Sequence, residues 1–153
     1  WEIFLLCGDP SKPEIGANFH PATTKDGWFG MPDNLAIDSR NRLWVGTDGN
    51  EPEKTGRGDG IWLVETEGPM RRRSTHFYRV PAGAECTGPF FTPNDETLFV
   101  SIQHPGDDGP SYPAHGRFSS ADDPSTRWPD FKPDMPPRPA VVAITRKGGG
   151  KVG

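Results

Sequence analysis

Short runs of apolar residues along the chain are each closed by Gly, Pro, Asn or Asp. Short apolar runs that are bounded by turn residues are typical of β-strands. No segment carries a 3.6-residue period long enough to predict a helix. The expected strands are Glu2–Cys7, Asn34–Asp38, Arg42–Gly46, Gly60–Glu65, His76–Val80, Gly88–Thr92, Thr97–Gln103 and Ala140–Arg146. The pattern predicts an all-β fold.

One unit of this pattern occurs twice, at Pro32–Val45 and at Thr87–Val100. Each copy contains an apolar strand, a polar turn and a second apolar strand with an aromatic residue. The spacing of the two copies suits the blades of a β-propeller, which hold about four strands each. Because one blade cannot bury both of its faces, we expect this chain to be part of a larger ring.

The expected blades divide the chain into one complete and one incomplete unit. A four-stranded antiparallel blade is predicted from about residue 34 to 80, and an incomplete blade from about residue 87 to 146. The second unit contains a long loop, residues 104–138, that is dense in Pro, Gly, Asp and Ser. Loops longer than about 12–15 residues often carry function. The missing fourth strand is expected from upstream sequence, since the chain opens on Trp1 and we interpret this start as a truncated or processed end.

Composition supports short strands joined by many turns. The chain has 19 Gly and 18 Pro, yet its five Trp and nine Phe argue against wholesale disorder. A net charge of −4 gives no basic footprint for nucleic acid, and the Arg71–Arg73 run is predicted to be a solvated turn. No apolar stretch approaches the roughly 20 residues of a membrane span. Cys7 and Cys86 are too few for a disulfide framework and are expected to be structural thiols.

Candidate metal ligands lie where the innermost strand of each unit begins, because the loops entering these strands face the channel of a propeller. Asp33 and Asn34 hold this place in the first unit, and Glu85 holds it in the second. Hard oxygen atoms suit Ca²⁺, which takes six to eight of them at about 2.3–2.6 Å. Turn capping is an equal alternative for Asp33 and Asn34. Glu85 lies between small residues, and we favour a ligand over a solvated turn residue there.

Other polar residues are weaker candidates. His104 ends a predicted strand and could serve as a metal ligand or a general acid near neutral pH, with a hydrogen-bonded structural role as the alternative. Asp48 is interpreted as a turn residue. Carboxylates on the long loop could add ligands or simply be solvated: Asp107, Asp108, Asp122, Asp123 and Asp130. The sequence has no Gly-rich phosphate loop, Cys-x-x-Cys pair or Gly-x-Ser-x-Gly elbow.

Several longer segments together resemble a known family. They are Phe4–Pro10, Pro32–Asp38, Leu43–Gly49, Gly83–Pro89, Leu98–Gly106, Trp128–Asp130, Pro137–Val142 and Ile144–Lys147. In this order the chain resembles the C-terminal part of the PhoX-type alkaline phosphatases. The Gln103–Gly106 block after an apolar strand is specific, whereas Pro32–Leu35 is also similar to gluconolactonase-like propellers.

The resemblance implies a six-bladed propeller that acts as a phosphomonoesterase on small phosphoesters. It also implies export through the twin-arginine route to the periplasm or the exterior, and a cluster of Ca²⁺ and Fe³⁺ on the channel axis. Carried over by position, Glu85 would be a metal ligand, and Asp33 and Asn34 would be a second ligand pair. His104 is a further candidate, for substrate binding. The family's cysteine ligand for iron lies upstream and is not transferred to Cys7 or Cys86.

Two alternatives remain open from the sequence. One is a gluconolactonase-like hydrolase that uses a single divalent metal, and the other is a non-catalytic propeller module. Because two blades hold only part of a channel site, we expect this fragment alone to be inactive if the parent protein is a phosphatase.

Overall fold

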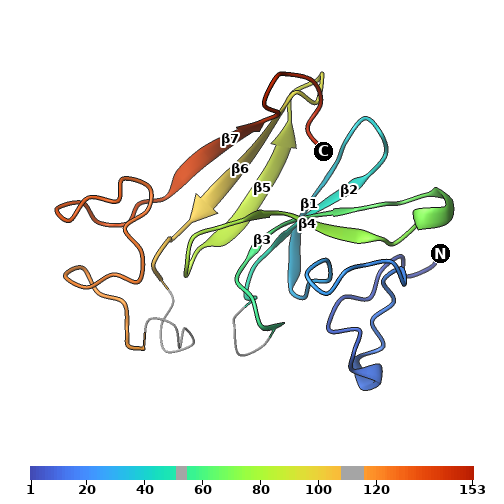
Figure 1. Ribbon diagram of the computed structural model, residues 1–153, viewed down its shortest axis with the longest axis horizontal. Coiled ribbons are helices and arrows are strands. Elements are labelled where there is room, and N and C mark those ends of the chain that lie inside the picture. The colour runs from blue at the N-terminus through green and yellow to red at the C-terminus, as the bar shows by residue number, and fades with distance from the viewer. Residues whose placement is uncertain (51–54, 108–115) are drawn as a thin grey trace.

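A computed structural model describes residues 1–50, 55–107 and 116–153, which form two antiparallel β-sheets (Figure 1). The four-stranded sheet has the order β1 (Pro32–Ile37), β2 (Leu43–Thr47), β3 (Gly60–Val64) and β4 (Ser74–Arg79). The three-stranded sheet has the order β5 (Glu85–Phe91), β6 (Thr97–Gln103) and β7 (Ala140–Thr145). The chain also contains two short 3-10 turns, η1 (Pro13–Ile15) and η2 (Gly68–Met70). The predicted all-β fold is confirmed.

The strand bounds follow the sequence pattern, although β1 and β4 each begin two residues before the predicted start and β5 begins three residues before it. β6 lies where it was predicted, whereas β5 begins at Glu85 and not at Gly88. The pairing of β5 with β6 is interrupted between Thr87 and Phe90, and it continues on the other side of this bulge. Pro89 has no N–H to give to the ladder, so the interruption falls where the sequence cannot pair. The residues before it still form strand.

The predicted strand Glu2–Cys7 is wrong. This segment runs without strand pairing, and its backbone is held by isolated hydrogen bonds, such as Asn18 N to Leu6 O and Gly8 N to Phe29 O. Its side chains Phe4, Leu5 and Cys7 pack against the four-stranded sheet. The apolar run therefore reflects burial of these side chains and not pairing with a neighbouring strand.

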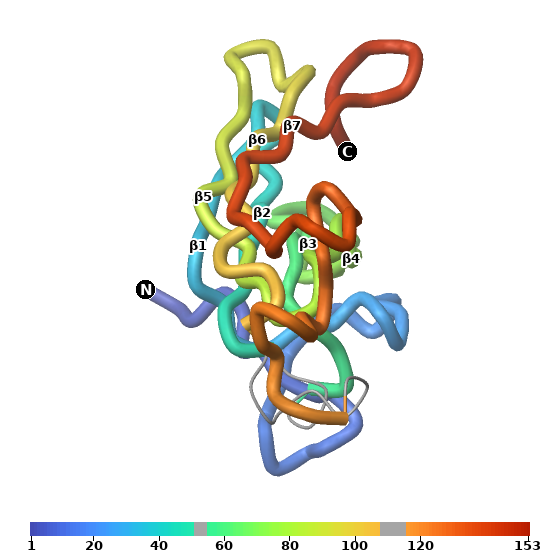
Figure 2. The backbone as a smooth tube through the Cα atoms, turned by 90° about the vertical axis from the view of Figure 1, so that its left-hand side faces the viewer, coloured from blue at the N-terminus to red at the C-terminus, as the bar shows by residue number. Residues whose placement is uncertain are grey.

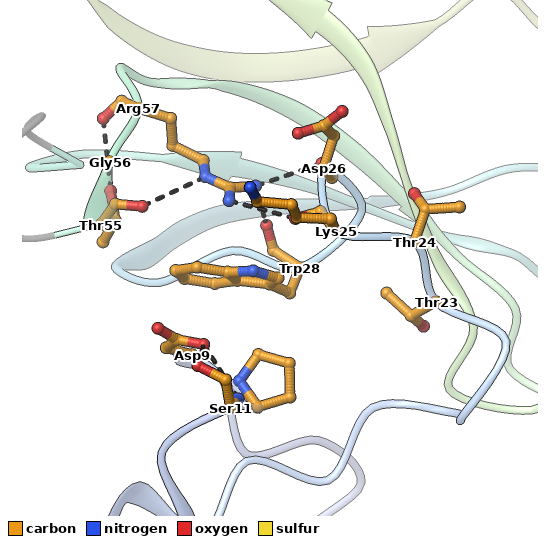
Figure 3. A pocket seen from close by; sticks show the side chains of 11 residues that line it. Asp9, Ser11, Thr23, Thr24, Lys25, Asp26, Trp28, Thr55, Gly56 and Arg57 are labelled. Carbon is orange, nitrogen blue, oxygen red and sulfur yellow. Dashed lines mark hydrogen bonds between the residues drawn. The ribbon is translucent and has the colours of Figure 1, made fainter.

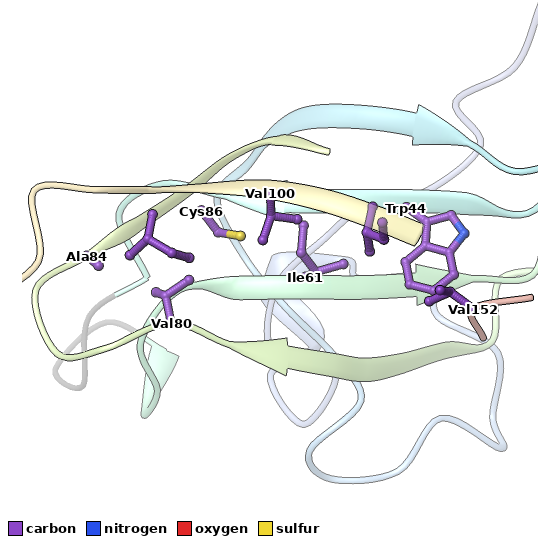
Figure 4. Packing of buried hydrophobic residues seen from close by; sticks show 9 residues of the cluster. Trp44, Ile61, Val80, Ala84, Cys86, Val100 and Val152 are labelled. Carbon is purple, nitrogen blue, oxygen red and sulfur yellow. The ribbon is translucent and has the colours of Figure 1, made fainter. Parts of the chain in front are cut away.

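The main core lies between the two sheets (Figure 4). Trp44 is fully buried there and meets the rings of Phe77 and Phe91 edge-on, at 4.7 and 5.1 Å between centroids. The other buried members are Ile61, Val80, Ala84, Cys86, Leu98, Val100, Ile102 and Val152. Val152 comes from the last residues of the described chain, which fold back so that its N–H donates to Asp95 O. This core joins the two sheets into one unit.

A second cluster covers the other face of the four-stranded sheet. Phe29, Val45, Trp62 and Val64 are buried there beneath the N-terminal segment. The arrangement is visible in Figure 1, where residues before β1 lie along that sheet and away from the three-stranded one. Most of the four-stranded sheet is therefore covered on both sides.

The three-stranded sheet is covered on one face only. Leu98, Val100 and Ile102 of β6 point into the main core, so Phe99 and Ser101 point the opposite way. Their cross-strand partners, Phe90 and Val141, are 66% and 67% exposed. An apolar face is thus left open. No helix in the described residues is both long and apolar enough to cross a membrane.

Candidate functional site

The candidate ligands lie on β1 and β5, the first strands of the two sheets, which lie next to each other (Figure 2). Asp33 and Asn34 lie within β1, and Glu85 begins β5, so these residues belong to the strands and not to the loops before them. Asn34 Oδ1 accepts a hydrogen bond of 2.9 Å from Gly88 N, and its amide donates to the Asp33 carboxylate. Asn34 thereby connects the two sheets at this point.

Glu85 is a buried carboxylate in a negatively charged setting. The residue is 7% exposed, and its Oε2 accepts a 2.7 Å hydrogen bond from Gln103 Nε2. Burial raises the pKa of Glu85, the negative charges of Asp48 and Asp33 raise it further, and His104 opposes them. A carboxylate that is costly to ionise beside two others is a place where a bound cation would be stabilising.

His104 lies at the same carboxylate. Its Nε2 is 3.5 Å from Glu85 Oε2, and its Nδ1 is 3.0 Å from the Gly83 carbonyl. A carbonyl oxygen can only accept, so Nδ1 carries the hydrogen and Nε2 faces Glu85. The ring is therefore anchored to the backbone just before β5. The assignment of His104 to substrate binding stays a prediction.

Two residues of this region were missed by the sequence interpretation. Asp48 lies at the bend that follows β2, as the turn interpretation predicts, and its negative charge also raises the pKa of Glu85. It directly follows Thr47, which pairs with Pro32, and so it lies at the same end of the sheet as Asp33. Gln103 was not singled out, although it pairs with Glu85 in the β5–β6 register. The register of the strands was the signal that would have found both.

The oxygen donors of the candidate residues are of the type that a hard cation prefers, but they are too few to complete its coordination shell. Carboxylate and amide oxygens from β1 and β5 are the ligand type that calcium prefers. Among the described residues, however, no three His, Cys, Asp or Glu side chains come together closely enough to hold a metal ion. The described residues therefore supply part of a coordination shell.

The loop carboxylates do not complete that shell in the described part of the chain. Asp123 forms an ion pair with Arg117, and Asp130 forms one with Arg138 at 2.6 Å. Asp108 lies outside the described residues. These pairings fit the alternative interpretation of Asp123 and Asp130 as surface residues.

A cavity of about 730 Å³ lies elsewhere, beside Trp28 and Arg57 (Figure 3). The Arg57 guanidinium lies 4.1 Å from the centre of the Trp28 ring and donates to the carbonyls of Trp28, Asp26 and Lys25. Asp9 lies on the other side of the ring. Arg57 is thus committed to holding backbone in place, and none of the candidate ligands lines this cavity. We place the candidate site at Glu85.

The two cysteines are free thiols, as expected from their number. Burial raises the pKa of Cys7 to about 11 and that of Cys86 to about 12, the latter with a further contribution from the charges of Asp59 and Glu85. Both thiols are therefore protonated at neutral pH. This state suits packing better than metal ligation, which needs the thiolate.

Fold and site together define an all-β protein whose two sheets meet at a buried, negatively charged carboxylate. Comparison with known proteins specifies the class further. The sequence model described as "Alkaline phosphatase PhoX" matches residues 1–106. The chain belongs to the PhoX alkaline phosphatase family.

A solved structure agrees with this assignment. Pseudomonas fluorescens PhoX, in complex with vanadate as a transition state analogue, is similar with a TM-score of 0.69 and 30% sequence identity. The match covers 97% of this chain and 23% of that one, so the chain spans about a quarter of the length of this relative. No curated protein matches the chain. The family assignment agrees with the resemblance to the phosphatases and not with the resemblance to gluconolactonase-like propellers.

Proposed function

We propose that this chain forms part of a metal-dependent alkaline phosphatase that releases inorganic phosphate from small phosphoesters. Membership of the PhoX family supports this function. The observation that carries the proposal for this chain is the Glu85 carboxylate. It is buried, and the negative charges of Asp48 and Asp33 raise its pKa. The similar structure is a complex of Pseudomonas fluorescens PhoX with vanadate, which is described as a transition state analogue for that protein.

In this proposal the two sheets are neighbouring blades of a six-bladed propeller. Two open apolar surfaces support the idea. Leu35 and Ile37 of β1 are 61% and 64% exposed at one side, and Phe90 and Val141 are exposed on the outer face of the three-stranded sheet. Each is a surface against which a further sheet could pack. The greater length of the matched phosphatase provides room for such sheets.

Glu85, Asp33 and Asn34 would contribute oxygen ligands to Ca²⁺ or Fe³⁺, and the position of Asp48 adds it to this group. Bound metal ions would activate an attacking oxygen and stabilise the charge that develops on the phosphoryl group. Further donors from outside the described residues would complete the shell. Within this chain, Glu85 provides a buried negative charge and Asn34 holds β1 against β5 beside it.

His104 is proposed to bind substrate beside Glu85; its Nδ1 is held by the Gly83 carbonyl and its Nε2 faces the Glu85 carboxylate. The protein is proposed to work in the periplasm or outside the cell, where phosphoesters too polar to cross a membrane would meet it. The proposed location follows the family resemblance.

The test is hydrolysis of p-nitrophenyl phosphate by the full-length protein supplied with Ca²⁺ and Fe³⁺. We expect turnover that a chelator abolishes, and no turnover by residues 1–153 alone. Glu85→Gln should lower kcat/KM on the order of 100-fold, since loss of a ligand costs at least as much as loss of an outer-shell partner. Glu96→Gln, an exposed change on the same hairpin, is the matched control.

Full-length protein that stays inert with both metals would overturn the enzymatic assignment. If the wild type is active but Glu85→Gln keeps both its bound metal and its activity, the site is not at Glu85.

A further inference from the structure

Glu85 and Gln103 lie directly opposite each other in the antiparallel β5–β6 ladder. Directly opposite residues in such a ladder project their side chains to the same face at close range. The Gln103 amide nitrogen accordingly lies 2.7 Å from Glu85 Oε2. The contact is therefore dictated by strand register and not by chance contact between flexible side chains.

The amide has one workable orientation against this carboxylate. Its oxygen would repel Oε2, so the NH₂ group must face Glu85. Because Glu85 is 7% exposed, this hydrogen bond replaces water that the carboxylate has lost on burial. Within the described residues, the polar contacts of the carboxylate go to Oε2. Oε1 is left as the oxygen available to a ligand.

The residues after Gln103 fix its position relative to β5. His104 Nδ1 lies 3.0 Å from Gly83 O, and Gly106 N donates to Ala82 O at 2.9 Å. Pro105 and Gly106 are buried. The end of β6 is thereby fastened to the segment that leads into Glu85, which fixes the backbone of Gln103 relative to β5; the Gln103 side chain itself is exposed and is held by its bond to Glu85.

We propose that Gln103 is a positioning residue, which orients the Glu85 carboxylate by its Nε2–Oε2 hydrogen bond and presents Oε1 to a divalent cation. This inference rests on the proposed function, in which Glu85 is a ligand. Gln103 itself does not touch the cation; it acts through Glu85. Partners of this kind typically change metal affinity or activity by about 10–100-fold when they are removed.

The experiment uses the full-length protein stripped of metal and titrated with Ca²⁺ by calorimetry. Gln103→Met keeps the length of the side chain and removes the amide, and we expect it to weaken calcium affinity about tenfold. Asn94→Leu is the matched control, because Asn94 Nδ2 makes a similar 2.9 Å bond to Glu96 Oε2 at the other end of the same hairpin. Its calcium affinity should equal that of the wild type.

A double-mutant cycle separates positioning from a general structural effect. In the Glu85→Gln background, Gln103→Met should cause no further loss of calcium affinity or of kcat/KM, because its target has gone. Thermal unfolding of the metal-free Gln103→Met protein should match the wild type to within a few degrees, which shows that the fold is kept.

Three results overturn the inference. One is unchanged calcium affinity of Gln103→Met in a wild type that binds calcium and hydrolyses p-nitrophenyl phosphate. Another is an equal loss in the Glu85→Gln background, which would make Gln103 structural. A wild type that neither binds calcium nor turns over substrate refutes the proposed function, and with it this inference.

Discussion

Asp38 is a buried carboxylate that connects the β1–β2 turn to the core. Its Oδ1 accepts from the N–H groups of Arg40 and Arg42, and its Oδ2 accepts from Arg42 Nε at 2.8 Å and Trp44 Nε1 at 3.0 Å. Burial alone would raise the pKa of Asp38, but the hydrogen bonds from Trp44 and Arg42 and the charge of Arg42 together lower it. The ionised form is therefore favoured by folding.

Because this pKa is lower in the folded protein, Asp38 stabilises the fold above the pKa of the unfolded carboxyl, about 3.9, and the contribution is lost as the pH falls through the folded value. Asp38→Asn should lower the free energy of unfolding by about 3 kcal/mol at neutral pH, since it leaves Arg42 without its buried partner. Denaturant unfolding between pH 2 and 7 measures this. A deficit that does not shrink toward acid pH would contradict the assignment.

The ionisation of Glu85 changes the stability of the fold with pH in the opposite direction to that of Asp38. Its pKa is raised by burial and by Asp48 and Asp33, so in the metal-free protein its ionisation opposes folding as the pH rises from the unfolded value toward the folded one. Glu85→Gln should raise the Tm of metal-free protein by a few degrees at pH 7 and leave it unchanged near pH 3. Saturating Ca²⁺ should reverse the order at pH 7. Scanning calorimetry with and without calcium measures these Tm values. A metal-free Glu85→Gln protein that is less stable than the wild type at pH 7 would contradict this prediction.

At the scale of elements, the site depends on how closely β2 approaches β5. A Cβ placed on Gly46 would lie 2.6 Å from the Cys86 carbonyl oxygen and 3.5 Å from Asn34 Cβ. Both neighbours belong to the segments that carry the candidate ligands. Gly46 therefore allows the two sheets to meet where Asn34 bonds to Gly88.

Gly46→Ala should separate β2 from β5 and cost about 1–3 kcal/mol, which is typical of overpacking. It should also weaken calcium binding, because Asn34 and Glu85 move apart. Thr75→Ala, at an exposed position of β4, is the control and should change neither quantity. Normal calcium affinity in Gly46→Ala would show that the close approach does not matter to the site.

At the scale of the whole molecule, the two sheets leave apolar side chains uncovered on opposite sides of the shared core. Ala36, next to Leu35 and Ile37 in β1, packs toward the main core, so these two side chains point to the other face. Phe90 and Val141 are exposed on the outer face of the three-stranded sheet. Large open apolar surfaces favour association with other surfaces.

Residues 1–153 alone should therefore self-associate and bind a hydrophobic dye. Replacing Leu35, Ile37, Phe90 and Val141 by Thr, which keeps strand propensity, should reduce both effects. Sedimentation velocity and dye fluorescence measure this, with full-length protein as the control. A monomeric chain that binds no dye would count against further sheets packing on these faces.

The local pattern of apolar and turn residues in the sequence predicts much of the fold but less of the candidate site. The strand Thr97–Gln103 was predictable because a two-residue period survives wherever one face of a sheet is buried. Glu2–Cys7 was mispredicted because an apolar run is also what a packed, unpaired segment needs. The start of β5 was missed because the bulge at Gly88–Pro89 hid the residues before it.

The sequence by itself determined the all-β class and the duplicated unit, because apolar runs and the turn residues that bound them are local features. It also singled out Glu85 as a candidate ligand, and that assignment stays a prediction. Tertiary structure alone decided that Asp48 and Gln103 belong beside Glu85. Their proximity is set by strand register and by the close approach of β1 and β2 to β5, which join residues far apart along the chain. Such contacts depend on the packing of whole sheets, and no local pattern encodes them.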